Sequence, residues 1–389
     1  MIKRLLEKQV KHATTQFPVV SITGPRQSGK TTLIKKCFPT YEYYNLEDPN
    51  TRSFIKDDPK QVVNITKKGA IFDEVQKYPD LLSFIQVTVD ETNKPGQYII
   101  SGSENLLLSE KVSQSLAGRV AVLNLLTLSI SELQADKLLD QDVFAQIYKG
   151  FYPRIYDQNI SATDFYSNYV NTYIERDVRL IKNIGDISQF QRFIQLLAGR
   201  AGQLSNASAI ANDLNVDSKT ISSWLNILEA TYIIFRLQPY FRNFGKRIIK
   251  NAKIYFHDVG LLAYLLGINS TTDMDVHFAR GALFENLVVA EIMKHIVNFN
   301  THIKPYFWRD STGNEIDILV DKGNMIDRFE IKASQTYKSD FSKGFDYWDG
   351  LPKQNKQDGN NYVIYNGNIE SKVKNYRLIN WKNIDHAFA

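Results

Sequence analysis

One short segment limits more than any other what this chain can fold into: GPRQSGKT, from Gly24 to Thr31. It fits the Walker A pattern, in which two glycines flank four residues and Lys and Thr follow. The apolar run VVSIT precedes it and TTLIKKCF overlaps its end, which predicts a strand, a tight loop and a helix. The glycines allow backbone angles that turn successive N–H groups toward one point, and the helix N-terminus adds partial positive charge. The segment is therefore predicted to bind the phosphates of a nucleotide.

The residues of this loop have separate expected roles. Pro25 has no N–H to donate, so the phosphate cradle is expected to begin at Gln27. Lys30 is expected to reach the β- and γ-phosphates, and Thr31 to coordinate Mg²⁺. ATP and Mg²⁺ are thus the predicted ligands. The predicted binding residues of the loop are Gly24, Gln27, Ser28, Gly29, Lys30, Thr31 and Thr32.

The segment AIFDE, at residues 70–74, supplies a matching Walker B pattern. Its apolar residues predict a short buried strand, with Asp73 at the end to hold Mg²⁺ through water. Glu74 is expected to orient and deprotonate the attacking water. After the next predicted strand, Ser101 or Ser103 is a candidate sensor of the γ-phosphate, although an ordinary turn explains these residues equally well.

Arg119, in SLAGR, is the candidate for an arginine that neutralises charge in the transition state. A surface arginine in a salt bridge is the alternative interpretation. If Arg119 acts on the site of a neighbouring copy, the protein must be an oligomer.

Apolar periodicity in the first third predicts strands that alternate with helices, as in βαβ units with a parallel sheet. From about residue 131 the pattern becomes helical, through Leu133–Lys149 and Asp164–Ile181. The predicted strands are Val19–Ile22, Tyr41–Asn45, Ala70–Phe72, Tyr98–Ile100 and Val120–Leu123.

The last part of the chain mixes a long helix, predicted over Gly281–Phe299, with strands at Glu315–Val320 and Phe329–Ala333. The C-terminal stretch is rich in Lys, Asn, Gly and Tyr and is expected to be solvated. With 389 residues, two or three domains are expected.

Composition narrows the class of protein. Hydrophobic residues make up 43% and charged residues 23% of the chain, which is typical of a globular protein. A net charge of only +5 means that any nucleic-acid surface must be a local concentration of charge. The lone Cys37 excludes an internal disulfide. The N-terminus resembles no secretory signal and no apolar stretch is long enough to span a membrane, so we expect a cytoplasmic protein without a membrane partner.

The middle segment SNASAIANDLNVDSKTISSWLNILEA predicts a helix-turn-helix. Asn215 tolerates left-handed geometry at the turn, and Asp217 or Ser218 can cap the second helix. The apolar positions at helical spacing are Ala207, Ile210, Ala211 and Leu214 in the first helix and Ile221, Trp224, Leu225 and Leu228 in the second. The side chains expected to face solvent, as in a recognition helix, are Lys219, Thr220, Ser223 and Asn226.

Two apolar strands are predicted next, Tyr232–Leu237 and Lys253–Phe256, which suggests a winged variant. No acidic residue occurs between Glu229 and Asp258, whereas basic and aromatic residues alternate there. Such a mixture favours phosphate contacts with nucleic acid, with protein docking as the alternative. The basic residues are Arg236, Arg242, Lys246, Arg247, Lys250 and Lys253, and the aromatic ones are Tyr240, Phe241 and Phe244.

Near the C-terminus, EIDILV and FEIKAS read as two strands of a hairpin that turns at Gly323-Asn324. This register sets Asp317 opposite Glu330 and Glu315 opposite Lys332, with a mainly apolar face behind. Two carboxylates about 5 Å apart beside a lysine can hold Mg²⁺ for phosphodiester cleavage, and Glu285 can add a ligand. This is the D…ExK arrangement of PD-(D/E)XK nucleases; a solvated sheet face with Lys–Glu pairs is the alternative.

The ordered set of motifs resembles one large prokaryotic family of AAA+-like ATP-binding proteins with a conserved C-terminal region of unknown function. The motifs are GPRQSGKTT, NLEDP, AIFDEVQKYPDLL, SLAGRV, YIERDV, KIYFHDVGLLAYLLG, RGALFENLVVAEI, NEIDILV and FEIKAS. The resemblance implies an α/β P-loop ATPase domain over 1–160, a helical and winged helix-turn-helix region over 161–268, and a nuclease-like α+β domain over 269–389.

Carried over by position, the resemblance gives Lys30, Thr31, Asp73 and Glu74 the ATPase roles. It makes Glu285, Asp317, Glu330 and Lys332 the nuclease-like residues, the three carboxylates being metal ligands. We therefore expect an ATPase whose nucleotide cycle alters how the C-terminal half engages a partner, with DNA as the main candidate. The alternatives are an ATP-gated nuclease and an ATP-regulated module that binds a protein.

Overall fold

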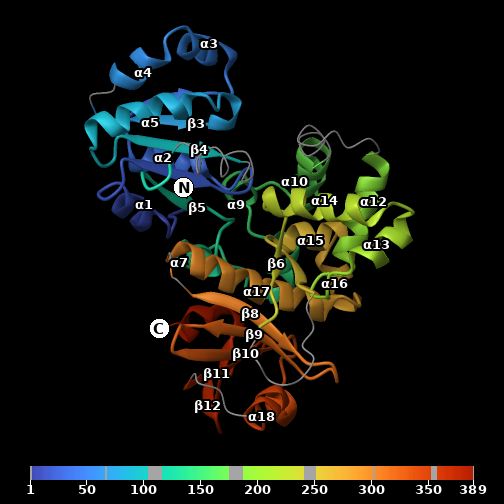
Figure 1. Cartoon of the computed structure of the whole chain (residues 1–389). Helices are drawn as coiled ribbons and strands as arrows, with labels where there is room; N and C mark the ends of the chain where they lie inside the picture. The colour runs from blue at the N-terminus through green and yellow to red at the C-terminus, as the bar shows by residue number, and fades with distance from the viewer. Residues whose placement is uncertain are drawn as a thin grey trace. The chain divides into compact units, whose positions relative to one another are not determined.

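The computed structural model describes residues 2–65, 68–103, 116–174, 187–240, 251–299, 301, 303–351 and 357–388. The chain forms two compact units (Figure 1). The first consists of Met1–Leu128, Ala230–Tyr232 and Val297–Asn300. The second consists of Ser129–Glu229, Ile233–Ile296 and Thr301–Ala389.

The first unit ends at Leu128, whereas the predicted ATPase domain extends to residue 160. Three hydrogen bonds at the start of helix α7 (Ile130–Ala135) accompany the earlier end. Ser129 and Glu132 form a capping box, and the Ile130 N–H donates to the buried Glu291 carboxylate at 2.8 Å. Glu291 belongs to α17 (Arg280–Asn298), so α7 is attached to the second unit.

A five-stranded, fully parallel sheet forms the centre of the first unit, with strand order β2-β3-β4-β1-β5. All five strands predicted in the first third are confirmed, with ends moved by one or two residues. Their bounds are β1 Val19–Thr23, β2 Glu42–Asn45, β3 Ala70–Asp73, β4 Tyr98–Gly102 and β5 Val120–Asn124. The helices are α1 Glu7–Ala13, α2 Lys30–Cys37, α3 Pro49–Asp57, α4 Pro59–Ile65, η1 Val75–Lys77 and α5 Leu81–Thr92.

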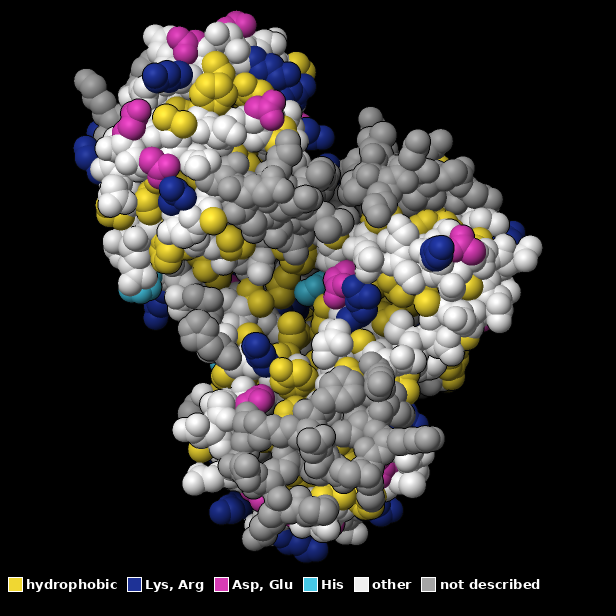
Figure 2. All heavy atoms as spheres, viewed as in Figure 1, with side chains coloured by type: hydrophobic (Ala, Val, Ile, Leu, Met, Phe, Trp, Pro, Cys, Tyr) yellow, Lys and Arg dark blue, Asp and Glu magenta, His cyan; other side chains and the backbone are white. Residues whose placement is uncertain are grey.

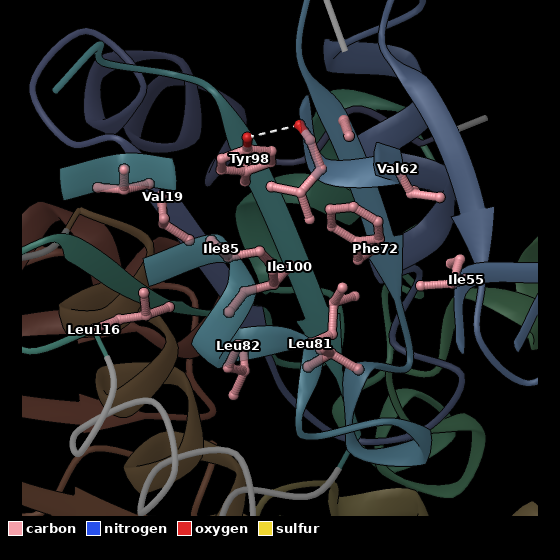
Figure 3. Close-up of a cluster of buried hydrophobic side chains, with 14 of the residues drawn as sticks. Val19, Ile55, Val62, Phe72, Leu81, Leu82, Ile85, Tyr98, Ile100 and Leu116 are labelled. Carbon is pink, nitrogen blue, oxygen red and sulfur yellow. Dashed lines mark hydrogen bonds between the residues drawn. The ribbon is translucent and has the colours of Figure 1, made fainter. Parts of the chain in front are cut away.

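Alternate residues of the strands point to opposite faces of this sheet, and a separate apolar cluster covers each face. Phe72 and Ile100 point to the face where Leu81 and Ile85 of α5 pack (Figure 3). The Tyr98 hydroxyl lies on that face as well and donates to the Val63 carbonyl at 3.0 Å. The other face packs against apolar residues of α1 and α2. Burial on both faces explains why the strands are continuous apolar runs.

The helical part of the second unit differs from its prediction in two places. The predicted helix Leu133–Lys149 is two helices, because the chain takes a left-handed turn at Lys137 (φ 58°) and restarts where Asp142 caps α8. The predicted helix Asp164–Ile181 is α10 followed by a π-helical turn, η2 (Val170–Ile174), and residues 175–186 lie outside the described ranges. The further helices are α8 Val143–Lys149, α9 Pro153–Asp157, α10 Ala162–Tyr169, α12 Ile187–Ala198, α15 Val259–Leu265 and α16 Thr271–Val276.

The predicted helix-turn-helix corresponds to α13 (Ala207–Leu214) and α14 (Ser218–Ala230). Asn215 ends α13 in the left-handed conformation, with φ 54°. The carboxylate of Asp217 accepts from the N–H groups of Lys219 and Thr220 and so caps α14. The predicted apolar residues of α14 are buried, and β6 (Ile234–Leu237) and β7 (Lys253–Phe256) then pair antiparallel.

The C-terminal part of the second unit is a mixed six-stranded sheet, in the order β12-β13-β11-β10-β9-β8. The strands β9 and β10 pair in the predicted register, with Phe329 beside Ile318 and Asp327 beside Val320. The C-terminal stretch expected to be solvated instead adds β11 and β13, whose Val363, Ile364 and Leu378 are buried. The elements are β8 Lys304–Arg309, β9 Glu315–Asp321, β10 Met325–Lys332, η3 Ser339–Ser342, α18 Lys343–Asp349, β11 Gln357–Tyr365, β12 Ser371–Val373, β13 Tyr376–Asn380 and η4 Trp381–Ala387.

On the face drawn in Figure 2, basic and acidic side chains are interspersed over the described surface. This mixture agrees with the small net charge of +5. None of the helices in the described ranges is long and apolar enough to cross a membrane.

Candidate functional sites

The predicted nucleotide residues come together because three neighbouring parallel strands end at the same edge of the sheet. The Walker A loop follows β1, Asp73 ends β3, and Ser101 lies in β4 between those two strands. The carboxyl ends of parallel strands are where α/β folds bind their ligands. The order of the sheet therefore gathers residues that are distant in the sequence.

The backbone of the Walker A loop has the conformation that its glycines predict. Gly24 has φ 145° and Gly29 has φ 91°, and Gln27 also lies in the left-handed region at φ 60°. A side chain at Gly24 would bring its Cβ to 2.1 Å from the Leu125 carbonyl oxygen. Helix α2 begins directly after Gly29 without a side-chain cap, so the first N–H groups of α2 remain available for an anion.

Lys30 is the first residue of α2, and its side chain folds back over the loop. The Nζ atom donates to the carbonyl oxygens of Gly24 at 2.9 Å and Pro25 at 2.8 Å. Burial lowers the pKa of Lys30 to about 8, although the charges of Glu74 and Asp73 act in the opposite direction. A cation with so few anionic partners is suited to phosphate oxygens.

The hydroxyl of Ser28 is fully buried and finds no hydrogen-bond partner among the described residues. A buried polar atom in this state is costly, and it marks a place where a ligand can supply the missing bond. Together with the uncapped end of α2 and with Lys30, it fits a bound phosphate. Gln27 and Thr32 are exposed at the same loop.

The carboxylate of Asp73, only 3% exposed, accepts hydrogen bonds from three hydroxyls. Thr31 and Tyr43 donate to Oδ2, each at 2.7 Å, and Ser101 donates to Oδ1. Walker A and Walker B are thus joined by the Thr31–Asp73 bond. Hard oxygen donors of this kind suit Mg²⁺, so the residues present fit the predicted ion.

Glu74 follows β3 in a left-handed conformation, with φ 57°. Such strain in a residue other than glycine is common at functional sites. Its Oε2 atom accepts from Gln76 and from the hydroxyl of Ser103, the latter at 3.2 Å. These two donors hold a carboxylate that stays partly exposed beside Asp73.

Arg119 does not belong to this cluster. Its carbonyl accepts from the N–H of Val19 at 3.2 Å, which sets Arg119 at the amino ends of β1 and β5. The Walker A loop lies at the carboxyl end of β1, a strand length of about 16 Å away. The guanidinium pairs with Asp90 instead. Arg119 therefore does not act at the protein's own nucleotide site. The alternative interpretation, a surface arginine in a salt bridge, describes it instead.

Sequence reasoning missed three residues of the nucleotide site. Tyr43 pairs with Ile71 across β2 and β3, and only the sheet order shows that its hydroxyl reaches Asp73. Gln76 lies two residues after Glu74, so its hydrogen bond to the Glu74 carboxylate could have been predicted from the sequence. Arg4 gives no sequence signal, yet its buried guanidinium donates to the carbonyl of Ser28 at 2.6 Å and supports the loop from behind.

In the second unit, the predicted nuclease-like residues line one pocket with a volume of about 1010 Å³. Glu285 comes from α17, Asp317 from β9, and Glu330 and Lys332 from β10. Exposed basic side chains, Lys338 and Lys343, lie at its edge with Arg309. The fold thus brings the four residues from three elements to one pocket.

Lys253 lies among the pocket's carboxylates and was not predicted there. Its side chain is 5% exposed; Nζ lies 3.1 Å from Glu285 Oε1 and pairs with Glu315. Burial opposes the charged form, yet Glu285, Glu315 and Asp317 raise the pKa of Lys253 above its usual value. Glu315 also pairs with Arg309 at 3.3 Å, rather than with the predicted Lys332.

Of the predicted basic cluster, Lys253 is thus an internal counter-ion and Arg236 pairs with Glu229. Neither is a free phosphate contact. Arg242, Lys246, Arg247 and Lys250, with Phe241 and Phe244, lie outside the described residues.

The predicted metal ligands are already engaged by groups of the protein. Asp317 Oδ2 accepts from the Ile331 N–H at 2.7 Å, and Glu330 Oε2 accepts from Lys332 Nζ at 2.6 Å. Within the described ranges, no three His, Cys, Asp or Glu side chains are grouped so that they could hold a metal ion. Glu285, Asp317 and Glu330 therefore share a pocket without forming an ion site as they stand.

Glu330 is buried, and its Oε1 atom has no hydrogen-bond partner in the described part of the chain. Burial and the charge of Asp317 raise the pKa of Glu330 to about 8. The Lys332 ammonium, which donates to Oε2, acts in the opposite direction. Gly344 of α18 allows the close approach, since a Cβ there would lie 2.1 Å from Oε1.

Comparison with known families divides the chain into three segments. Residues 16–134 match the AAA domain family. Residues 140–272 match a domain of unknown function, DUF8612, and residues 280–384 match another, DUF4143. The AAA match covers the five-stranded sheet and the site at its edge, so the first unit contains a P-loop ATPase domain.

Relatives and solved structures extend this comparison. An uncharacterized protein of Mycobacterium tuberculosis is 30% identical over 336 residues, which cover 84% of this chain and 73% of that protein. One from Haemophilus influenzae is 24% identical over 298 residues, covering 67% and 72%. The Walker-type ATPase PABY2304 of Pyrococcus abyssi has 14% identity and a TM-score of 0.43, over 68% of this chain and 96% of that one.

The identity and coverage of the mycobacterial relative, together with the AAA and DUF4143 matches, settle the family. The chain belongs to the prokaryotic family of AAA-type P-loop ATPases that carry a C-terminal DUF4143 region.

Proposed function

We propose that the protein binds ATP with Mg²⁺ at the Walker site and hydrolyses it, and that this cycle alters how the C-terminal half engages a partner. One observation carries the ATPase proposal. The buried Asp73 carboxylate joins Thr31, Tyr43 and Ser101 beside an uncapped helix end, with Lys30 and the orphan Ser28 hydroxyl at the same loop. The uncapped start of α2 and the Ser28 hydroxyl are donors that phosphate oxygens at this loop would satisfy.

Bound Mg²⁺ would be held by Thr31 and Asp73 and would neutralise charge on the transferred phosphate. Lys30 would exchange its two carbonyl acceptors for phosphate oxygens. Glu74, held by Gln76 and Ser103, would orient a water molecule and accept its proton. Ser101, bound to Asp73, is placed to report a change at the ion to β4.

Coupling to the C-terminal half is supported by Tyr232, which follows α14 and belongs to the first unit. The Thr23 hydroxyl, the Asn124 side-chain oxygen and the Tyr232 hydroxyl form a triangle with sides of 2.6, 2.8 and 2.9 Å. Thr23 directly precedes Gly24 of the Walker A loop. Any shift of that loop on nucleotide binding would therefore be felt by the segment between α14 and β6.

Tyr232 also has a positive φ of 58°, a conformation that costs a bulky residue about 1–3 kcal/mol. Its hydroxyl contacts offset part of this cost. The residue is thus held in place by bonds that the nucleotide site can strengthen or weaken, which suits a coupling element.

DNA remains the partner that we propose first. Lys219 is exposed on α14 and the predicted Ser223 is partly exposed, as in a helix that contacts nucleic acid, and the segment 241–250 is rich in basic residues. Other expected contacts are weakened: the Thr220 hydroxyl donates to Asp217, and Asn226 accepts from Arg236. A protein partner is therefore the main alternative. A metal-dependent nuclease is a further alternative, which the arrangement of Lys253 disfavours.

The Walker roles predict a split between binding and turnover. Lys30→Ala should abolish ATP binding, whereas Glu74→Gln should bind ATP like the wild type and lose turnover by about 10²–10⁴-fold, the usual contribution of a general base. Nucleotide binding by calorimetry and phosphate release in steady state measure the two effects. Equal hydrolysis by wild type and Glu74→Gln would remove Glu74 from the mechanism.

The lowered pKa of Lys30 predicts a pH dependence of ATP affinity. With a pKa of about 8, Lys30 is charged at pH 7 and mostly neutral at pH 9, so affinity should fall about tenfold between these values. An ordinary lysine would stay charged over this range. Lys30→Arg is the control. Because arginine remains charged, the ATP affinity of this variant should change little between pH 7 and pH 9. A flat wild-type profile would contradict this account.

The proposed coupling predicts that Tyr232→Phe uncouples nucleotide from α14. Hydrogen exchange of the α14 and β6 amides should change on adding a non-hydrolysable ATP analogue in the wild type and change much less in the variant. Loss of the hydroxyl should also cost about 1 kcal/mol of unfolding free energy. Tyr156→Phe, which removes another hydrogen-bonded hydroxyl, is the matched control. The same nucleotide response in Tyr232→Phe as in wild type would refute the coupling.

Replacing Lys246, Arg247 and Lys250 by alanine should weaken DNA binding and flatten its dependence on salt. Each lost phosphate contact lowers the slope by about 0.9, so the slope should fall by up to about 3. The control replaces the exposed Lys8, Lys60 and Lys94 and changes the net charge equally. DNA-binding titrations of the wild type and both triple variants at several salt concentrations measure the affinity and its salt dependence. If both triple variants bind like the wild type, the segment 241–250 is not the DNA contact.

A further inference from the structure

The position of Lys253 has consequences for the whole C-terminal pocket. Lys253 is the first residue of β7, and the hydrogen bonds between β7 and β6 fix its backbone. Its ammonium reaches Glu285 on α17 and Glu315 on β9, so one side chain joins three elements. The ammonium is also 5.6 Å from the centre of the Phe307 ring, and Tyr255 donates to the same Glu285 oxygen at 2.6 Å. The Lys253–Glu285 contact is therefore part of a packed, buried network rather than an isolated surface ion pair.

A buried group of carboxylates needs a cation, and either a metal ion or an ammonium can supply it. Mg²⁺ binds carboxylate oxygens at about 2.0–2.1 Å. An ion held by Glu285 in this way would lie within a few ångströms of the Lys253 ammonium, and the two positive charges would repel each other strongly in so buried a site. The two cations therefore compete for the same carboxylates.

Lys332 is a second ammonium that contacts acidic side chains of the pocket. Its Nζ lies 2.6 Å from Glu330 Oε2 and 3.8 Å from Asp317 Oδ2. Lys332 has a place in the D…ExK pattern, whereas Lys253 has none. The difference between this pocket and a metal-binding one of the same pattern thus rests on Lys253.

We propose that the Lys253 ammonium is a built-in cation that takes the place of a divalent metal ion, so that this pocket excludes such ions. The pocket would then serve binding rather than metal-dependent cleavage, consistent with the reuse of enzyme-like folds for other tasks. The exclusion of metal ions does not involve the basic residues at the edge of the pocket, Arg309, Lys338 and Lys343. The inference concerns the second unit alone and does not depend on the ATPase proposal.

The test measures Mn²⁺ binding to the nucleotide-free full chain by electron paramagnetic resonance and calorimetry. The main variant, Lys253→Met with Glu315→Gln, removes the ammonium and one carboxylate together, which keeps the net charge and leaves Glu285, Asp317 and Glu330 in place. It should bind Mn²⁺ at least about tenfold more tightly than the wild type, one decade being about 1.4 kcal/mol. Adding Asp317→Asn to this variant should remove the gain.

Two controls separate charge from the loss of a carboxylate. Glu315→Gln alone keeps the ammonium, and Lys253→Arg keeps a cation in its place, so neither should gain Mn²⁺ affinity. Any ion at the Walker site is common to all variants and cancels in the comparison. If the double variant does not fold, Lys253→Met alone is followed by its melting temperature, which Mn²⁺ should raise well beyond any rise in the wild type.

Four results would overturn the proposal. One is an Asp317-dependent Mn²⁺ site in the wild type that is as tight as in the double variant. Another is a folded double variant without any gain in Mn²⁺ affinity. The third is a single variant whose melting temperature is insensitive to Mn²⁺. Cleavage of DNA by the wild type that needs a divalent ion and is lost in Asp317→Asn would count against it equally, whatever the state of the ATPase.

Discussion

The arrangement of the first unit depends on one buried carboxylate. Asp73 is removed from water, and such a charge is tolerated only if donors surround it. The three hydroxyls that meet this need come from α2, β2 and β4. Satisfying Asp73 therefore also sets how far apart these elements lie. The hydrogen bonds that stabilise the buried charge also align the Walker A loop with the end of β3.

The two candidate sites differ in how far their polar groups are already satisfied by other groups of the protein. At the nucleotide site, the start of α2 has no side-chain cap, the Ser28 hydroxyl has no partner among the described residues, and the Lys30 ammonium donates to two carbonyl oxygens. That arrangement favours an incoming anion. In the C-terminal pocket, acids and lysines satisfy one another, with Glu330 Oε1 as an exception within the described residues. An incoming charge must there displace an existing partner.

Local patterns predicted much of this from the sequence. Periodicity and glycine spacing gave the five strands and the loop, because both are properties of neighbouring residues, and the hairpin register followed from its turn. Partners that depend on which strands become neighbours could not be predicted: Tyr43 reaches Asp73 only through the pairing of β2 with β3. Lys253 was misplaced for the same reason, since basic spacing along a chain does not show that a side chain turns inward. The C-terminal stretch was misjudged because strands inside a sheet tolerate Asn and Lys at their exposed ends.

Connectivity and packing disagree at Ala230–Tyr232: the peptide runs from α14 to β6, yet these residues belong to the compact unit built on the parallel sheet. A fragment cut at any single point in the chain therefore cannot reproduce that unit. An isolated N-terminal fragment would expose Thr23 and Asn124 where the tyrosine now lies, next to the Walker A loop. An exchange of the nucleotide domain between relatives would also have to include this short, distant segment.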